Sequence, residues 1–143
     1  MGKRIVFEYP DNQVICYAYD KSYVGKGVAS YKEDSIEDHP NKLVGESIAY
    51  SKAKRSIVKQ KISDKKKELE TLNNFIVYLF PQRFQGRYVE WMRERAQKRI
   101  KALTRAIEHL EFEKKEIDES IEDYLKERAG FIKRLQRKRK ETV

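Results

Sequence analysis

Residues 43–79 read LVGESIAYSKAKRSIVKQKISDKKKELETLNNFIVYL and repeat apolar side chains at alternating intervals of four and three. This spacing is typical of a helix that packs along its length against another helix. The seam positions are Val44, Ile48, Ser51, Arg55, Val58, Ile62, Lys65, Leu69, Leu72, Ile76 and Leu79. Pro81 ends the pattern, because proline disfavours helical geometry in the residue before it. The repeat predicts a first long helix over residues 40–80.

The same periodicity returns after a short interruption. Residues 81–87 form the predicted turn, and a second long helix is predicted over residues 88–132, with a break near Gly130. Its seam positions are Val89, Met92, Ala96, Ile100, Leu103, Ile107, Leu110, Lys114, Ile117, Ile121 and Tyr124. Two long helices joined by a short connection predict an antiparallel hairpin.

Charge supports one pairing of the two helices. If Leu72 faces Ala96, the basic stretch Lys52–Lys61 runs beside the acidic stretch Glu108–Glu116. Apolar spacing and opposite charge therefore agree on the same register.

The N-terminal segment, residues 1–39, has the features of a small sheet and a loop. Its β-branched and aromatic runs are separated by short polar turns. Strands are predicted at Ile5–Tyr9, Val14–Tyr19 and Tyr23–Tyr31, the last of them loosened by Gly25 and Gly27. The predicted fold is a single α+β domain, in which a short antiparallel β-meander precedes a long antiparallel two-helix hairpin.

The composition favours a binding protein with an anionic partner. The chain has 143 residues and a net charge of +9, and 38% of its residues are charged, so its core is thin. Neither His39 nor His109 shows a pattern that brings it to Cys16 or to a serine. Because Cys16 is the only cysteine, an internal disulfide and a cysteine-based zinc site are excluded. We expect no enzymatic activity, no cofactor and no metal.

The sequence also predicts a cytoplasmic protein that does not enter a membrane. No signal-peptide pattern is present at the start, because Glu8 and Pro10 interrupt any apolar run. The longest apolar stretch, Phe75–Phe80, is too short to span a bilayer.

The predicted tip of the hairpin is the first candidate ligand site. It interleaves cations with aromatic side chains, and its candidate ligand-binding residues are Arg83, Phe84, Arg87, Trp91 and Arg95. Nucleobases stack on aromatic faces, and arginines form paired hydrogen bonds with phosphates. In the alternative interpretation, the aromatic residues cap the hairpin core and the arginines are solvated.

Arg55 and Lys114 form the second candidate, because both occupy seam positions and the register places them opposite one another. Two unpaired cations in one layer are costly. Either a carboxylate such as Glu113 pairs with them, or their stems turn outward, or an anionic ligand lies between the helices. The basic tail, residues 133–143, is either a contact for a nucleic acid or an acidic surface, or a frayed end that aids solubility.

A pattern shared with small phage proteins runs from Gly27-Val28-Ala29 through an acidic loop to Gly45, Ile48-Ala49 and Lys52-Ala53. In those proteins a hairpin ending in Gly-x-Ala leads to a helix carrying Gly-x-x-Ile-Ala-x-x-Arg-Ala, and Lys52 stands here in place of the arginine. With its sheet and long hairpin, the chain most resembles the phage Thoeris anti-defence sponges.

That resemblance implies a protein that sequesters a cyclic ADP-ribose signal made by host TIR enzymes, and in some sponges cyclic oligonucleotides, without degrading it. It also implies a dimer or larger homo-oligomer. Exposed flanks predict self-association independently, and these are Ile57, Phe75, Phe112, Phe131 and Ile132. The alternatives are a nucleic-acid-binding or CRISPR-inhibiting phage protein and a coiled-coil adaptor.

Overall fold

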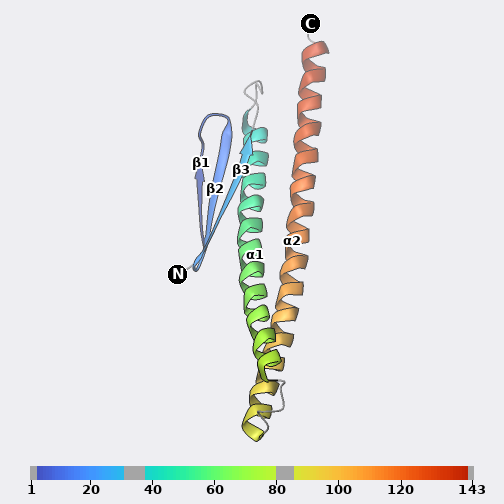
Figure 1. The fold of residues 1–143 in the computed structure, drawn as a ribbon. Helices are drawn as coiled ribbons and strands as arrows, with labels where there is room; N and C mark the ends of the chain where they lie inside the picture. The colour runs from blue at the N-terminus through green and yellow to red at the C-terminus, as the bar shows by residue number, and fades with distance from the viewer. Residues whose placement is uncertain (1–2, 31–37, 80–85, 142–143) are drawn as a thin grey trace. The chain divides into compact units, whose positions relative to one another are not determined.

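The described part of the chain forms three strands followed by two long helices (Figure 1). A computed structural model describes residues 3–30, 38–79 and 86–141. The elements are β1 (Arg4–Glu8), β2 (Gln13–Asp20), β3 (Tyr23–Ser30), α1 (Asp38–Leu79) and α2 (Arg87–Glu141). The predicted α+β fold, a sheet followed by a helical hairpin, is confirmed.

The strands form an antiparallel sheet in the order β1-β2-β3. Its two connections are tight turns, in which Asn12 and Lys21 adopt φ values of 57° and 56°. The first turn is closed by a hydrogen bond of 2.9 Å from the Gln13 amide to the Pro10 carbonyl. Such short turns fix the register of the strands, so that alternate side chains of β2 share one face.

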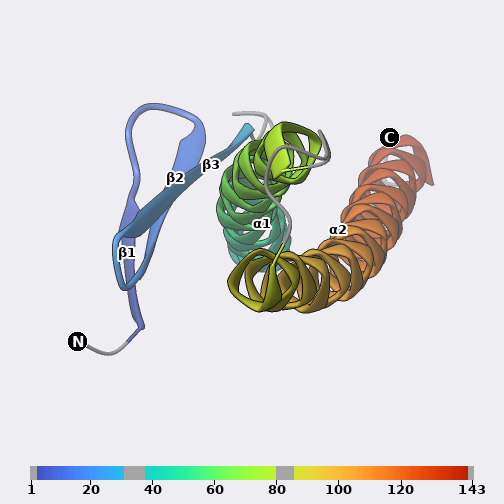
Figure 2. The same cartoon turned by 60° about the horizontal axis from the view of Figure 1, so that its bottom comes forward.

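One face of the sheet packs on the first part of α1, beside which it lies in Figures 1 and 2. The buried residues of this core are small or β-branched on both sides of the contact. They are Val14, Cys16, Ala18 and Ala29 of the sheet and Ile48, Ala49, Ala53 and Ile57 of α1. Burial raises the pKa of the Cys16 thiol, because the charged thiolate is disfavoured away from water.

Gly25 and Gly27 bring β3 into direct contact with the backbone of α1. A Cβ atom added at Gly25 would overlap the carbonyl oxygen of Ala53, and one added at Gly27 would overlap that of Ala49. Glycine therefore admits a helix where no side chain fits. The sequence predicted that these glycines loosen the strand, whereas they form its closest tertiary contact.

The residues that carry the phage-protein pattern meet in this same contact. Gly27 lies over Ala49, and the ammonium group of Lys52 donates a hydrogen bond of 3.0 Å to the carbonyl oxygen of Val28. Packing of a strand on a helix is thus a sufficient physical reason for the pattern. The pattern bears on the fold more directly than on a ligand.

Ile57 corrects one prediction. It was expected on an exposed flank, but it is only 6% exposed, and its side chain lies against Gly25. The heptad positions predict only the face of α1 that packs on α2. The sheet covers a second face of α1, and Ile57 lies on that face. Phe75 is half-buried and Phe112 is exposed, whereas the side chains of Phe131 and Ile132 lie outside those described.

The chain divides into two compact units. Residues 1–58 and 114–143 form the first, and residues 59–113 form the second. In the first unit Tyr124 of α2 packs against the core of the sheet and α1. A hydrogen-bonded ion pair of 2.9 Å between Arg55 and Asp118 also joins the two helices there.

The second unit is a two-helix hairpin with a buried seam. Its buried residues all occupy predicted seam positions and are Ile62, Ile76, Ala96, Leu103, Ile107 and Leu110. Ion pairs join Lys66 to Glu111 at 3.3 Å and Arg99 to Glu68 at 2.9 Å. The ends of α1 and α2 nearest in sequence belong to this unit, so the helices run antiparallel within it.

The end of α2 differs from the prediction. The helix continues through Gly130 to Glu141, so the expected end at residue 132 is wrong and residues 133–141 are helical. One glycine costs a helix interior only about 1 kcal/mol. The residues that follow it include Leu135, Gln136 and several lysines and arginines, all strong helix formers.

Tyr9 provides a pH-dependent test of the contact between the sheet and α1 within the first unit. Its hydroxyl donates a hydrogen bond of 2.7 Å to Glu46 of α1. That bond, with some burial and the charge of Glu46, raises the pKa of Tyr9 from 10.0 to about 12. The hydrogen bond needs the protonated phenol, so its contribution to stability is complete below pH 10 and is lost as the pH rises through about 12.

We expect Glu46→Gln to lower the pKa of Tyr9 toward its ordinary value, because the substitution removes the carboxylate that disfavours the phenolate. Ultraviolet titration of phenolate formation measures this change. The spectrum of Tyr9→Phe identifies which part of the titration belongs to Tyr9. An unchanged late-titrating tyrosine in Glu46→Gln would contradict the contact.

Candidate functional site

Tyr88, Trp91 and Arg95 form a column of stacked side chains on the surface of α2. The rings of Tyr88 and Trp91 are stacked, with centroids 6.0 Å apart and an angle of 24° between their planes. The guanidinium carbon of Arg95 lies 4.8 Å from the centroid of the Trp91 ring. Helical spacing produces this arrangement, since residues three and four apart are neighbours on one face.

The residues of the column differ in exposure. Tyr88 lies one turn before Trp91 and Arg95 lies one turn after it, so both are neighbours of Trp91 along the helix. Tyr88, at the end of the column, is 70% exposed, and Trp91 is 50% exposed. Tyr88 belongs to the aromatic set that the sequence placed at the tip, but it was not among the candidate ligand-binding residues, although its spacing of three from Trp91 is the signal.

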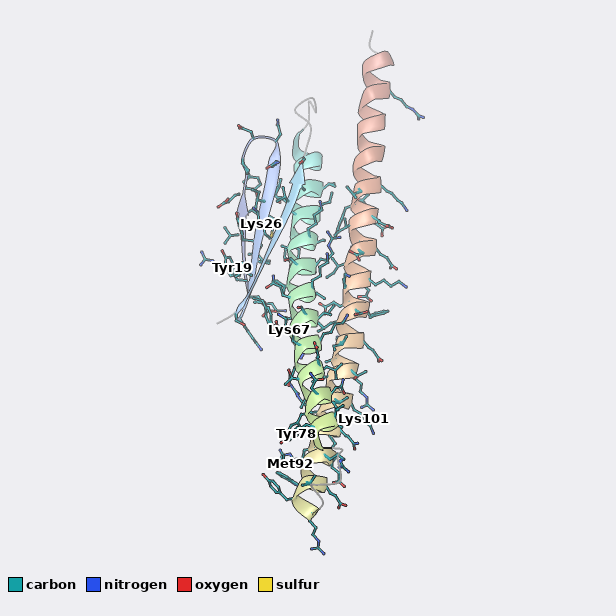
Figure 3. All side chains as sticks on the ribbon, in the orientation of Figure 1. Tyr19, Lys26, Lys67, Tyr78, Met92 and Lys101 are labelled. Atoms are coloured by element: carbon teal, nitrogen blue, oxygen red, sulfur yellow. The ribbon has the colours of Figure 1, made fainter. Side chains whose placement is uncertain are left out.

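The cations around the column differ in their availability. Arg87 precedes Tyr88 and is exposed. Arg99, one turn beyond Arg95, is held by Glu68 in the ion pair already described. Met92, labelled in Figure 3, is half-buried in the helix seam next to Trp91. Of the remaining predicted residues, Arg83 and Phe84 lie outside the described part of the chain.

The second candidate site consists of Arg55 and Lys114. Arg55 is answered by a carboxylate, as one of the three interpretations predicted, but by Asp118 and not by Glu113. Asp118 lies one helical turn beyond Lys114, within reach of a long arginine side chain. Lys114 is half-buried. The ion pair removes the physical reason for a ligand at Arg55, whereas a ligand at Lys114 stays a prediction.

The described residues offer no alternative centre based on a metal. Among them, no three histidine, cysteine, aspartate or glutamate side chains are grouped so as to hold a metal ion. Likewise, neither described helix has a stretch long and apolar enough to cross a membrane.

Comparison with known protein families, with characterised proteins and with solved structures found no match to this chain. Inference about function therefore depends on the chemistry of the column and on the resemblance described above.

Proposed function

We propose that this protein is a non-enzymatic binder that captures a nucleotide at the column of α2. A base stacks on the exposed ring of Tyr88, and Arg87 and Arg95 contact the phosphates. The observation that supports this proposal is the stacked, exposed arrangement of Tyr88, Trp91 and Arg95. Base stacking on an aromatic side chain contributes about 1–3 kcal/mol, and a hydrogen bond to a charged group about 1.5–3 kcal/mol.

The ligand that the resemblance to the anti-defence sponges favours is a cyclic ADP-ribose isomer, with cyclic oligonucleotides as related ligands. Such a ligand carries both groups that the column suits, a flat base and a diphosphate. An exposed platform on one helix leaves most of the ligand in water, so tight capture requires a second surface. We propose that another subunit of a homo-oligomer supplies it, and that the protein sequesters the signal in the host cytoplasm.

Nucleic-acid binding is the second candidate function. The observation that favours it is the continuation of α2 to Glu141, which carries the basic residues 133–140 on a helix and not on a frayed tail. A basic helix suits the backbone of a nucleic acid. Salt separates the two functions, because a protein that contacts many phosphates loses affinity steeply as the salt concentration rises.

The test uses Trp91, the only tryptophan of the chain, as a fluorescent reporter inside the column. Titration with a cyclic ADP-ribose isomer should change its emission, and calorimetry should give the affinity. We expect Tyr88→Ala to weaken binding about tenfold or more, because it removes the stacking platform. Phe112→Ala is the matched control, since Phe112 is an exposed aromatic residue of the same helix and the same unit.

Equal affinity of Tyr88→Ala and the parent would contradict the assignment of the site. If the parent binds no cyclic nucleotide but binds duplex DNA with a steep salt dependence, the second candidate function replaces the first. Mass spectrometry of nucleotides released by denaturing the purified protein would identify a ligand that is already bound.

A further inference from the structure

The face of the sheet away from α1 carries its own set of aromatic and basic side chains. Val14, Cys16 and Ala18 of β2 are buried toward α1, so the residues between and after them lie on the opposite face. That outer face comprises Arg4, Val6 and Glu8 of β1, Gln13, Ile15, Tyr17 and Tyr19 of β2, and Val24, Lys26, Val28 and Ser30 of β3. Tyr19 and Lys26 are labelled on the sheet in Figure 3.

The strand register places one cation directly beside each tyrosine. Tyr19 pairs with Arg4 on β1, and Tyr17 pairs with Lys26 on β3. The ammonium group of Lys26 lies 5.9 Å from the centroid of the Tyr17 ring. Tyr19 is 38% exposed, and both cations are exposed. Two aromatic rings on the central strand are thus flanked by positive charge from both edge strands.

We propose that this outer face binds single-stranded nucleic acid. One base stacks on Tyr17 and another on Tyr19, while Arg4 and Lys26 contact the phosphates. Residues two apart on a strand are about 7 Å apart, roughly twice the ~3.4 Å per nucleotide of a stacked strand. The face therefore suits unstacked bases that are splayed apart, which a single strand offers and a duplex does not.

Charge favours a nucleic acid over a second copy of this chain as the occupant. Glu8 is the only acidic residue of the outer-face set, and it lies at the end of the sheet away from Tyr19. Lys26 stands beside Tyr17 of the central strand, so a second copy packed face to face would bring unpaired ammonium groups into an apolar contact. Phosphates would instead neutralise both Lys26 and Arg4.

The experiment measures binding of a fluorescently labelled oligouridylate by fluorescence anisotropy. All chains carry Tyr88→Ala and glutamine in place of the lysines and arginines of residues 133–140, so that neither the column nor the basic end of α2 contributes. The double variant Tyr17→Val/Tyr19→Val keeps strand-forming apolar side chains and removes both rings. We expect it to bind about tenfold or more weakly. The matched control, Tyr17→Phe/Tyr19→Phe, keeps both rings and should bind nearly as tightly as its Tyr88→Ala parent.

Equal binding by the valine and phenylalanine variants would overturn the proposal, as would the failure of the Tyr88→Ala parent to bind the oligonucleotide. Sedimentation identifies the remaining alternative. If the valine variant alone dissociates a dimer into monomers, the face joins two copies of the chain and the proposal is wrong. These results do not depend on nucleotide capture at Tyr88, which is measured separately in the chain that retains Tyr88.

Discussion

Gly27→Ala should lower the free energy of unfolding of the sheet unit by about 3 kcal/mol. The added methyl group has no space, because it would overlap the carbonyl oxygen of Ala49 and also crowd the amide nitrogen of Ala53. Both are backbone atoms of α1, so no side-chain rotation relieves the overlap. The strand or the helix must move, and the movement opens the core around Val14 and Cys16.

Chemical denaturation followed by circular dichroism measures this loss. Gly45→Ala is the matched control, because Gly45 is also buried, but an added methyl group there meets only the Val14 side chain at 3.4 Å. Alanine is the better helix former by about 1 kcal/mol, so this control should be neutral or slightly stabilising. A Gly27→Ala protein as stable as Gly45→Ala would show that the strand does not approach the helix so closely.

Leu103→Ala should destabilise the hairpin unit by about 3 kcal/mol. Leu103 is only 1% exposed and lies among the buried seam residues of residues 59–113. Its truncation removes apolar contacts and leaves a cavity that the two packed helices cannot close without shifting. Ile107 and Leu110, in the next two turns of α2, are the buried neighbours that would have to move.

Trp91 belongs to the same unit as Leu103, so its fluorescence follows the unfolding of that unit. The fluorescence midpoint should fall to a lower denaturant concentration in Leu103→Ala. Val77→Ala is the control, because Val77 lies in the same unit, is 67% exposed, and its truncation should cost less than about 1 kcal/mol. Similar midpoints for the two variants would mean that the seam at Leu103 is not buried in solution.

The helix seam was predictable because its signal is local and repeated. Leu103, Ile107 and Leu110 follow one another at heptad spacing, and all three are buried. The sheet contact was not predictable in the same way. Gly25 and Gly27 suggest a weak strand when the chain is read alone, because only the packed structure shows that α1 occupies the space of the missing side chains.

The sequence predicted that charges would pair and that rings would lie among cations. It did not predict which residues would be the partners. The sequence led us to expect Glu113 or another carboxylate as a partner of Arg55, and the structure shows that the partner is Asp118. Trp91 was recognised as an aromatic residue among cations. That Arg95 covers one side of it depends on side-chain conformation, which periodicity does not specify. The sequence therefore indicated Trp91 and Arg95 as site residues, but not their stacking with Tyr88 in one column.

Along the sequence, the hairpin unit (residues 59–113) lies between the two segments of the other unit. This arrangement determines the order in which the parts of the two units are synthesised. Residues 59–113 are continuous, so the hairpin unit is complete in the nascent chain before residues 114–143 are made. The sheet leaves the ribosome before the hairpin unit, but its own unit also includes residues 114–143, which are made after that hairpin. At ~5–20 residues per second, residues 114–143 take roughly a few seconds to synthesise. Until those residues are synthesised, the sheet can pack on α1 but not on the last part of α2. The close contact of Gly25 and Gly27 of β3 with α1 is the part of the unit that can already form.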